Sequence, residues 1–438
     1  MTAALAGRIA AALDGSPFAT RRDVVAALLA EAPDGAPHLE ALSDGVFAGL
    51  ARAAAASPEQ TRIVVRRRGF LARARELEAG GVERRIAELE ADAGAEEPAP
   101  DLEQLLDAMR LLRREDMLLA ACADFGGVAE FEAVSRWLSA LAEHIVRRAL
   151  RAALRTLRGP EPVLAVVAMG KLGGREFTYH SDLDLIFLSE SGVEAVHAAS
   201  RVAQRLISYV TTKTGAGSAY SVDSRLRPSG NQGMLVTSFA GFEAYQLSDA
   251  QTWEYLALVR ARTIAGSVEP CDGSLARVEE RAFGRGSGRW GEVADMRRRV
   301  EKERAASAAS TIELKVGAGG LMDVEFLAEG AVLELGRAAA EVPIPSVPAL
   351  LRHWAGAAAD ATLAHYRLLR RVEGRLRWCA GRAVESCERD DARLADVAEL
   401  VEPGLAAEAL VARIDTARAA VRTAFDAVVE AGTIRALR

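Results

Sequence analysis

The sequence predicts an α+β fold in which a small mixed β-sheet is embedded in a predominantly helical chain. Residues 163–169 form a short apolar run rich in valine, which is typical of a central strand buried on both faces. Long segments before and after this region repeat leucine, valine and alanine at helical spacing. We therefore expect a sheet of about four or five strands, four of which lie at residues 163–169, 182–188, 219–227 and 234–238.

Length and composition limit the class of protein. The chain has 438 residues. A domain with a single hydrophobic core is usually shorter than this, so we expect two or three domains. Its net charge of −6 provides no overall basic field, and we expect no nucleic-acid partner. The sequence shows neither a membrane-spanning apolar run nor a signal peptide, which indicates a cytoplasmic protein without membrane contact. The four cysteines lack metal-ligand spacing and fit reduced thiols.

Charge and turn residues divide the chain into three predicted parts. Residues 1–100 are expected to form a helical region ending in an acidic linker, because residues 88–103 carry seven acidic side chains, no basic ones and two prolines. Residues 101–270 are expected to hold the sheet, preceded by two amphipathic helices within residues 102–157. Residues 271–438 are expected to form a helical C-terminal domain.

The segments that connect the strands are also predictable. A helix is expected at residues 194–213, and the third and fourth strands are expected to pair as a hairpin around the turn at 228–233. Residues 242–266 have the pattern of one helical block. A second glycine-rich turn within 311–336 enters a helix at about Leu321.

Three aspartates form the main candidate site. Asp182 and Asp184 lie two residues apart on one strand and therefore share a face, and Asp223 lies on a neighbouring strand. Carboxylates this close repel each other unless a cation lies between them, and Mg²⁺ prefers oxygen ligands. We expect a two-metal site in which Asp182 and Asp184 hold both ions, while Asp223 holds the catalytic ion and is a candidate proton acceptor. The alternative is that Asp182 and Asp184 are strand-end residues in a turn.

A glycine-rich turn, Gly-Lys-Leu-Gly-Gly, follows the first strand. Glycines let successive backbone N–H groups approach a ligand closely, so this turn is a candidate phosphate cradle. The chain has only four lysines, and two of them, Lys171 and Lys315, lie in glycine-rich turns. The candidate ligands of a nucleotide's phosphates are Lys171, Gly173, Gly174, Ser181 and Arg225.

Several roles stay open at this point. Lys315, with the glycines that follow it, either caps a phosphate at a helix N-terminus or forms a tight turn between domains. Four arginines contact phosphate or make internal ion pairs with Glu254, Asp323 or Glu325, and the structural role is favoured for each: Arg225, Arg227, Arg260 and Arg262.

Five blocks of residues together resemble the glutamine synthetase adenylyltransferase family. They are GKLGGRE at 170–176, SDLD at 181–184, VDSRLRPSG at 222–230, WE at 253–254 with ALVRAR at 257–262, and Lys315 with GGLMDVEF at 319–326. The likeness covers roughly residues 105–335. It implies a polymerase-β-like nucleotidyltransferase sheet, which makes residues 101–270 the catalytic domain. It also implies an enzyme that moves AMP from its substrate ATP to a tyrosine of glutamine synthetase with Mg²⁺, under control of PII-type signalling proteins and glutamine.

Members of that family usually carry two such catalytic halves, one that removes AMP by phosphorolysis and one that attaches it. The motif set occurs once here, so the chain resembles one half. Asp323 and Tyr245, the single tyrosine within residues 242–246, resemble the attaching half, whereas Glu329 departs from the family's usual glutamine. The alternatives are the phosphorolytic half, another polymerase-β-like nucleotidyltransferase with a different acceptor, and a non-enzymatic domain that senses PII proteins or docks glutamine synthetase.

Overall fold

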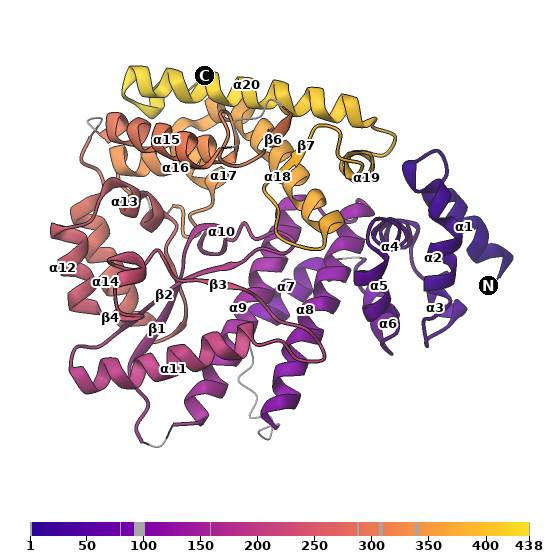
Figure 1. Ribbon diagram of the computed structural model, residues 1–438, viewed down its shortest axis with the longest axis horizontal. Helices are drawn as coiled ribbons and strands as arrows, with labels where there is room; N and C mark the ends of the chain where they lie inside the picture. The colour runs from indigo at the N-terminus through magenta and orange to yellow at the C-terminus, as the bar shows by residue number, and fades with distance from the viewer. Residues whose placement is uncertain are drawn as a thin grey trace.

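The computed structural model describes residues 2–78, 80–91, 101–157, 159–286, 289–305, 310–337 and 341–437. Within these ranges the chain is α+β, and helices surround a five-stranded mixed sheet (Figure 1). The N-terminal helices lie at one end of the molecule, and the C-terminal helices stack along another side, with the last long helix outermost (Figure 1). The α+β prediction is confirmed.

Helices account for most of the described residues. Those before the sheet are α1 (Ala3–Leu13), α2 (Arg22–Leu29), α3 (Ala36–Glu40), α4 (Asp44–Ala56), α5 (Pro58–Val65), α6 (Phe70–Arg75), α7 (Gly81–Ala91), α8 (Leu102–Phe125) and α9 (Phe131–Arg155). Those within and after it are α10 (Gly170–Gly173), α11 (Val193–Thr211), α12 (Phe239–Ser248), α13 (Thr252–Val259), α14 (Val268–Ala282), α15 (Trp290–Arg304), α16 (Leu321–Leu335), α17 (Val347–Ala355), α18 (Asp360–Ala380), α19 (Arg393–Val401) and α20 (Ala407–Ala431). In the ranges that the structure describes, no helix is both long and apolar enough to cross a membrane.

The sheet combines antiparallel and parallel pairs. Its strands are β1 (Leu164–Ala168), β2 (Leu183–Ser189), β3 (Val222–Asp223), β4 (Val236–Ser238) and β5 (Arg262–Gly266). β1 lies in the middle and pairs antiparallel with β2 and β5. The other edge of β2 carries both β3 and β4, each parallel to it. Asp184 of β2 is in register with Asp223 of β3.

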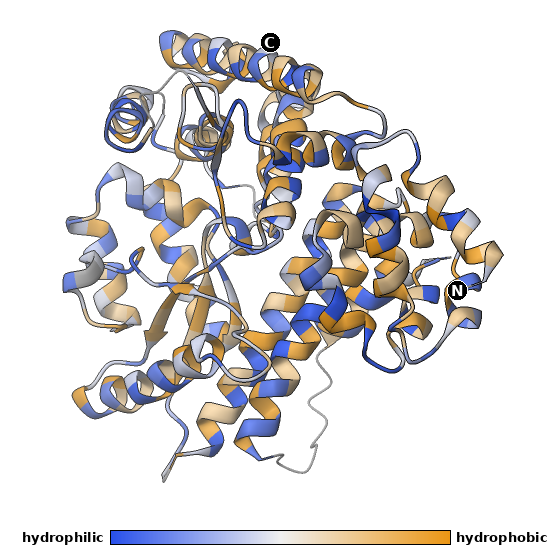
Figure 2. Cartoon of the chain, turned by 45° about the vertical axis from the view of Figure 1, so that its right-hand side comes forward, coloured by the Kyte–Doolittle hydropathy of each residue, from blue (hydrophilic) through white to orange (hydrophobic). Residues whose placement is uncertain are grey.

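The two faces of the sheet belong to two hydrophobic cores. Leu164, Val166 and Ala168 point into a core shared with α8, α9, α11 and the N-terminal helices. The alternate residues of β1, Ala165 and Val167, point into a second core built with α12 to α20. Because successive strand residues face opposite sides, a strand between two cores must be apolar throughout, as β1 is (Figure 2).

The acidic segment after α7 begins later than expected. Residues 88–91 belong to α7, which ends at Ala91, because Leu89 is buried on the face of α7 that packs against α9. α8 begins at Leu102, so residues 102 and 103 are also helical. The remainder of the predicted linker, residues 92–100, lies outside the described residues.

The predicted hairpin between the third and fourth strands is wrong. β3 covers only two of the expected residues, and β3 and β4 lie one after the other along the same edge of β2 instead of pairing with each other. The side chain of Asp223 explains the early end of β3. Its Oδ1 accepts a hydrogen bond from the backbone N–H of Arg225 at 2.9 Å, which turns the chain away from the sheet.

The predicted single helix at residues 242–266 is also wrong. The segment forms α12, α13 and the strand β5, because Gln251 and Glu254 form a capping box that starts a new helix. β5 then pairs with the free edge of β1, a long-range contact that local periodicity cannot reveal. A second sheet was also not predicted, and it joins β6 (Thr311–Glu313) to β7 (Ser386–Glu388). The helix expected at Leu321 is confirmed as α16.

Candidate active site

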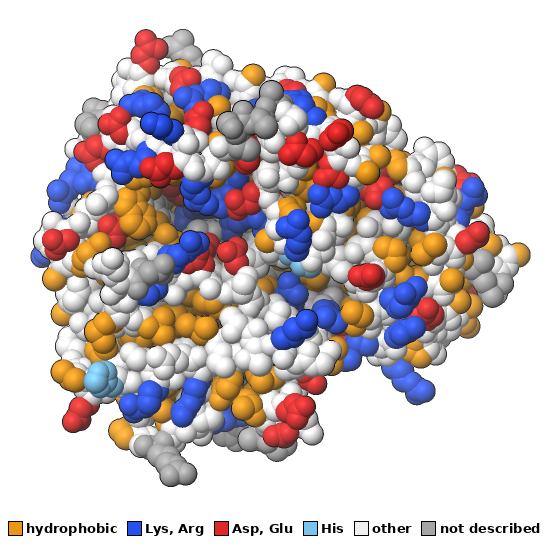
Figure 3. Space-filling model, viewed as in Figure 1, with side chains coloured by type: hydrophobic (Ala, Val, Ile, Leu, Met, Phe, Trp, Pro, Cys, Tyr) orange, Lys and Arg blue, Asp and Glu red, His pale blue; other side chains and the backbone are white. Residues whose placement is uncertain are grey.

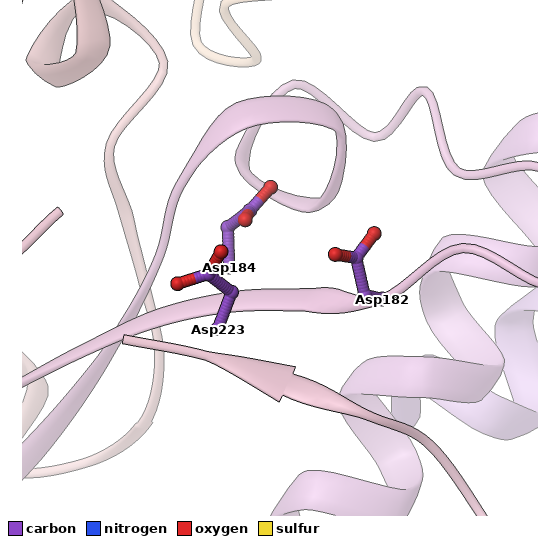
Figure 4. Close-up of side chains that lie close together, drawn as sticks. All are labelled: Asp182, Asp184 and Asp223. Carbon is purple, nitrogen blue, oxygen red and sulfur yellow. The ribbon is translucent and has the colours of Figure 1, made fainter. Parts of the chain in front are cut away.

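Three carboxylates converge at the edge of the sheet, as predicted. Asp182 immediately precedes β2, Asp184 lies within it, and Asp223 lies opposite Asp184 on β3. All three side chains rise from the same side of the two strands (Figure 4). One oxygen from each lies within 4.8 Å of the others. The parallel register of β2 and β3 creates this cluster, because side chains at paired positions of neighbouring strands share a face.

The charges in this cluster favour a bound cation. Burial and the neighbouring charge of Asp182 raise the pKa of Asp184 to about 6, although Lys315 and Lys171 oppose this shift. The hydrogen bonds from Arg225 instead lower the pKa of Asp223. Three hard oxygen donors that repel one another suit Mg²⁺, which would neutralise them. The donor set of the described residues therefore fits the expected metal.

Gly170 contributes to this site in a way that its place in the glycine turn did not reveal. It opens the single-turn helix α10 with φ of +52°. A Cβ atom at this position would lie 2.8 Å from Oδ2 of Asp184. Only glycine combines this backbone conformation with this close approach. The glycine therefore leaves room for the Asp184 carboxylate.

Gly170→Ala is expected to weaken Mg²⁺ binding about tenfold, because the new methyl group displaces a ligand carboxylate. Isothermal titration with Mg²⁺ measures this. Gly7→Ala is the matched control, since nothing lies within 4 Å of a Cβ there. Equal Mg²⁺ affinity of the Gly170 variant and the unmodified chain would contradict the placement of Asp184 in the metal site.

The other glycines of the turn are packed inside the protein. A Cβ atom on Gly173 would lie 1.8 Å from the backbone oxygen of Arg260, so glycine is required there for α10 to fit against the chain after α13. A Cβ on Gly174 would lie 3.1 Å from a carboxylate oxygen of Glu176 and 3.2 Å from the backbone oxygen of Pro345. The contacts of both glycines are therefore structural, and their part in holding phosphate stays a prediction.

Ser181 and Lys171 also have partners within the protein. Ser181 is buried, and its Oγ accepts hydrogen bonds of 3.3 Å from the N–H of Thr178 and from Arg377. Lys171 Nζ donates to Glu373 at 2.8 Å. Burial lowers the pKa of Lys171 to about 8, with the charge of Glu373 opposing the shift. Their contact with a nucleotide stays a prediction.

The helix α18 supplies a site residue that sequence reasoning missed. Glu373 is fully buried, and Arg370 and Arg377 of the same helix pair with it in addition to Lys171. These cations hold the pKa of Glu373 well below its usual range, against the effect of burial. The only sequence signal that pointed to a buried acidic partner here was the placement of a lysine in each glycine-rich turn. The positive charges of Lys171 and Lys315 both lower the pKa of Asp184, against the effect of burial.

The arginines mostly form internal ion pairs. Arg225 is largely exposed and pairs with Asp223. Arg227 donates to the backbone oxygen of Ser224 at 2.6 Å. Arg262 pairs with Glu143 of α9 and not with any of the three expected carboxylates.

Arg260 is buried among Glu176, Glu325 and Glu329. Of the three expected carboxylate partners, only Glu325 belongs to this group. Burial raises the pKa of Glu329 to about 8, opposed by Arg260 and reinforced by Glu325 and Glu176. A carboxyl whose pKa rises on folding stabilises the protein less as pH increases through that range.

Glu329→Gln is expected to flatten the fall in the free energy of unfolding between about pH 4.5 and pH 8. The reason is that Glu329 takes up a proton on folding there, worth up to ~1.4 kcal/mol per pH unit. Chemical denaturation at several pH values measures the slope. The exposed Glu280→Gln serves as control. Parallel stability curves for the Glu329 variant and the unmodified chain would rule out a raised pKa.

Two roles were left open for the turn that contains Lys315, and its geometry favours a tight turn over a phosphate cap. Lys315 Nζ donates to Glu385 at 2.9 Å. A Cβ on Gly319 would lie 1.8 Å from the backbone oxygen of Arg418 in α20, so this glycine permits close packing. Asp323 is fully buried, accepts a hydrogen bond from the N–H of Gly319 at 2.7 Å and pairs with Arg297. Tyr245 lies half-buried on α12.

Comparison with known proteins relates the chain to nucleotide-transferring enzymes. Residues 292–429 match the family model described as GlnD PII-uridylyltransferase. Residues 47–275 match the model described as glutamate-ammonia ligase adenylyltransferase. That second match covers just over half of the sequence, and the chain belongs to the glutamate-ammonia ligase adenylyltransferase family. The resemblance seen in the five motif blocks is confirmed at this level.

Curated relatives share part of their length with this chain. Three proteins named bifunctional glutamine synthetase adenylyltransferase/adenylyl-removing enzyme are 38%, 36% and 36% identical to it, from Thioalkalivibrio sulfidiphilus, Aromatoleum aromaticum and Haemophilus ducreyi. The alignments cover 54%, 53% and 54% of this chain and 27%, 26% and 27% of the relatives. The matched region thus spans about a quarter of each relative.

Proposed function

We propose that this chain transfers AMP from ATP to a tyrosine of glutamine synthetase. The observation that carries the proposal is the convergence of Asp182, Asp184 and Asp223 on one side of β2 and β3. Family membership and the names of the relatives support the substrate. The mixed sheet with helices on both faces is consistent with a polymerase-β-like nucleotidyltransferase fold.

The three aspartates have distinct proposed roles. Asp182 and Asp184 would hold two Mg²⁺ ions, and Asp223 would hold the one nearer the acceptor. When bound, these ions supply positive charge to the attacking and leaving oxygens. Asp223 is a weak base while Arg225 donates to both of its oxygens. Arg225 is exposed enough to turn from Asp223 towards the phosphates of ATP, which would leave the carboxylate free to ligate metal and to accept the tyrosine proton.

The glycine turns and their lysines would bind the β- and γ-phosphates of ATP, which leave as pyrophosphate. Lys171 and Lys315 lie close enough to Asp184 to influence its pKa. Each also contacts a glutamate, Glu373 or Glu385, which fixes its position before ATP binds. Gly173, Gly174 and Ser181 would support this binding through the backbone fold of the turn. Preorganised charges of this kind stabilise a developing anion most effectively.

The proposed direction is attachment of AMP. It rests on the resemblance of Asp323 and Tyr245 to the attaching half. PII-type signalling proteins and glutamine are the proposed regulators, and the cytoplasm is the proposed location. The phosphorolytic half of the family is the second candidate, because the relatives' names include both activities.

An assay with the full chain tests both function and direction. Unmodified glutamine synthetase and Mg-ATP labelled on the α-phosphate should yield labelled glutamine synthetase and pyrophosphate. Adenylylated glutamine synthetase with inorganic phosphate should yield little ADP. ADP formation without AMP incorporation would assign the chain to the removing activity. The absence of both products would overturn the proposal.

A further inference from the structure

A cavity of about 520 Å³ lies next to the segment that carries Asp182, because Ser181 is one of its lining residues. α5, α8, the segment after α11 and the turn after α18 form its walls. Four of its lining residues are cationic, namely Arg113, Arg114, Lys213 and Arg382, and Glu59 is the one acidic residue among them. Figure 3 shows both basic and acidic side chains around the hollow at the centre of this face.

These cations differ from most arginines of this protein in their surroundings. Within the described ranges, no ion pair joins any of the four to a carboxylate, whereas Arg85, Arg260 and Arg375 each have acidic partners. The guanidinium of Arg113 lies 4.8 Å from the ring centre of Tyr220. Among the residues that the structure describes, Arg382 makes one hydrogen bond, of 3.5 Å, to a backbone oxygen. A cavity with four unneutralised cations is suited to an anion.

A buried arginine behind the wall adds to this positive field. Arg110 of α8 is fully buried, and its acceptors in the described part of the chain are all backbone oxygens, including those of Gly217 and Tyr209 at 2.9 Å. It thereby fixes the segment that lines the cavity, and it brings a further charge without a carboxylate among its hydrogen-bond acceptors. His180, on the wall, stays neutral because burial and the charges of Arg113 and Arg377 lower its pKa to about 3.

We propose that this cavity binds a small anion carrying phosphate or carboxylate groups, at a site separate from the metal-binding carboxylates. The volume is in the range of small-molecule sites and too small for a folded partner. Ser181 and Ser221 line the cavity directly before Asp182 and Val222, and the N–H of Leu183 donates to the backbone oxygen of Ser221 at 2.9 Å. An anion held here would fix the two segments that carry the catalytic aspartates. Its binding therefore modulates the activity at those aspartates.

Pyrophosphate in EDTA is the direct probe, because without metal the three aspartates repel it. Isothermal titration of the full chain should show binding that Arg114→Ala weakens about tenfold or more. Arg298→Ala, an exposed arginine on α15, should leave the affinity unchanged. Without anion, the unfolding temperature of Arg114→Ala should equal or exceed that of the unmodified chain, since Arg113 repels Arg114. Inorganic phosphate and succinate, titrated in parallel, show whether phosphate or carboxylate groups are preferred.

Three results would overturn this inference. One is the absence of pyrophosphate binding in EDTA at millimolar concentration, with the unmodified chain folded. Another is binding that Arg114→Ala and Arg382→Ala both preserve, which would place the anion outside this cavity. An acidic peptide that binds in place of all three small anions would also contradict it. The readout is binding alone, so it is independent of whether AMP transfer is detected.

Discussion

Asp184→Asn is expected to reduce AMP transfer by at least about a thousandfold, the largest effect of any single change at the site. Asparagine keeps the shape of the side chain but removes one anionic ligand. Burial and the neighbouring charge of Asp182 also raise the pKa of Asp184 to about 6. The rate of labelled AMP incorporation at saturating Mg-ATP measures the loss.

The stability of the same variant separates catalysis from folding. Without metal, Asp184→Asn is expected to unfold at the same temperature as the unmodified chain or at a higher one, because repulsion from Asp182 and Asp223 is removed. Mg²⁺ should then raise the unfolding temperature of the unmodified chain more than that of the variant. Asp249→Asn, an exposed change at the end of α12, should alter neither property. Unchanged turnover of Asp184→Asn would remove the basis of the proposed mechanism.

The sequence was sufficient to predict that Asp182 and Asp184 share a face because the cause is local. Two aspartates at i and i+2 on a strand share a face in any sheet, and β1, β2 and β4 lie within a residue or two of their expected positions. The partner of β3 was not predictable in the same way. Proximity in sequence suggested a hairpin, whereas Asp223 ends the strand by accepting a backbone hydrogen bond.

The missed elements depend on contacts between distant parts of the chain. β5 is a strand because β1 has a free edge, and β6 pairs with β7 across more than seventy residues. Glu373 was missed because nothing in the sequence of α18 shows that it faces Lys171. The roles of Gly173 and Gly319 were ambiguous for a related reason. Glycine permits close approach to a ligand or to another backbone, and here both meet backbone. The boundaries at residues 100 and 270 stay predictions.

Loss of the buried pair between Asp323 and Arg297 is expected to destabilise the protein more than any other single change discussed. Both side chains are fully buried, and their charges compensate each other. Arg297 also donates to the backbone oxygens of Val316 and Gly317 at 2.9 and 2.8 Å, and Asp323 accepts from Gly319. The pair thus holds the glycine turn before α16. Removing one partner leaves a buried charge, which costs about 3–5 kcal/mol.

Chemical denaturation of Asp323→Asn, Arg297→Met and the double variant measures this. Each single change should lower the free energy of unfolding by about 3–5 kcal/mol, and the double variant should lose less than their sum, because neither charge is then left alone. The exposed pair of Asp295 and Arg298 lies on α15, the helix of Arg297, and is the matched control. Asp295→Asn should change the free energy of unfolding by less than about 0.5 kcal/mol. Additive losses in the double variant would show that the two residues act independently. If stability were retained in Asp323→Asn while AMP incorporation fell, Asp323 would act on substrate, and the structural role inferred from its burial would be wrong.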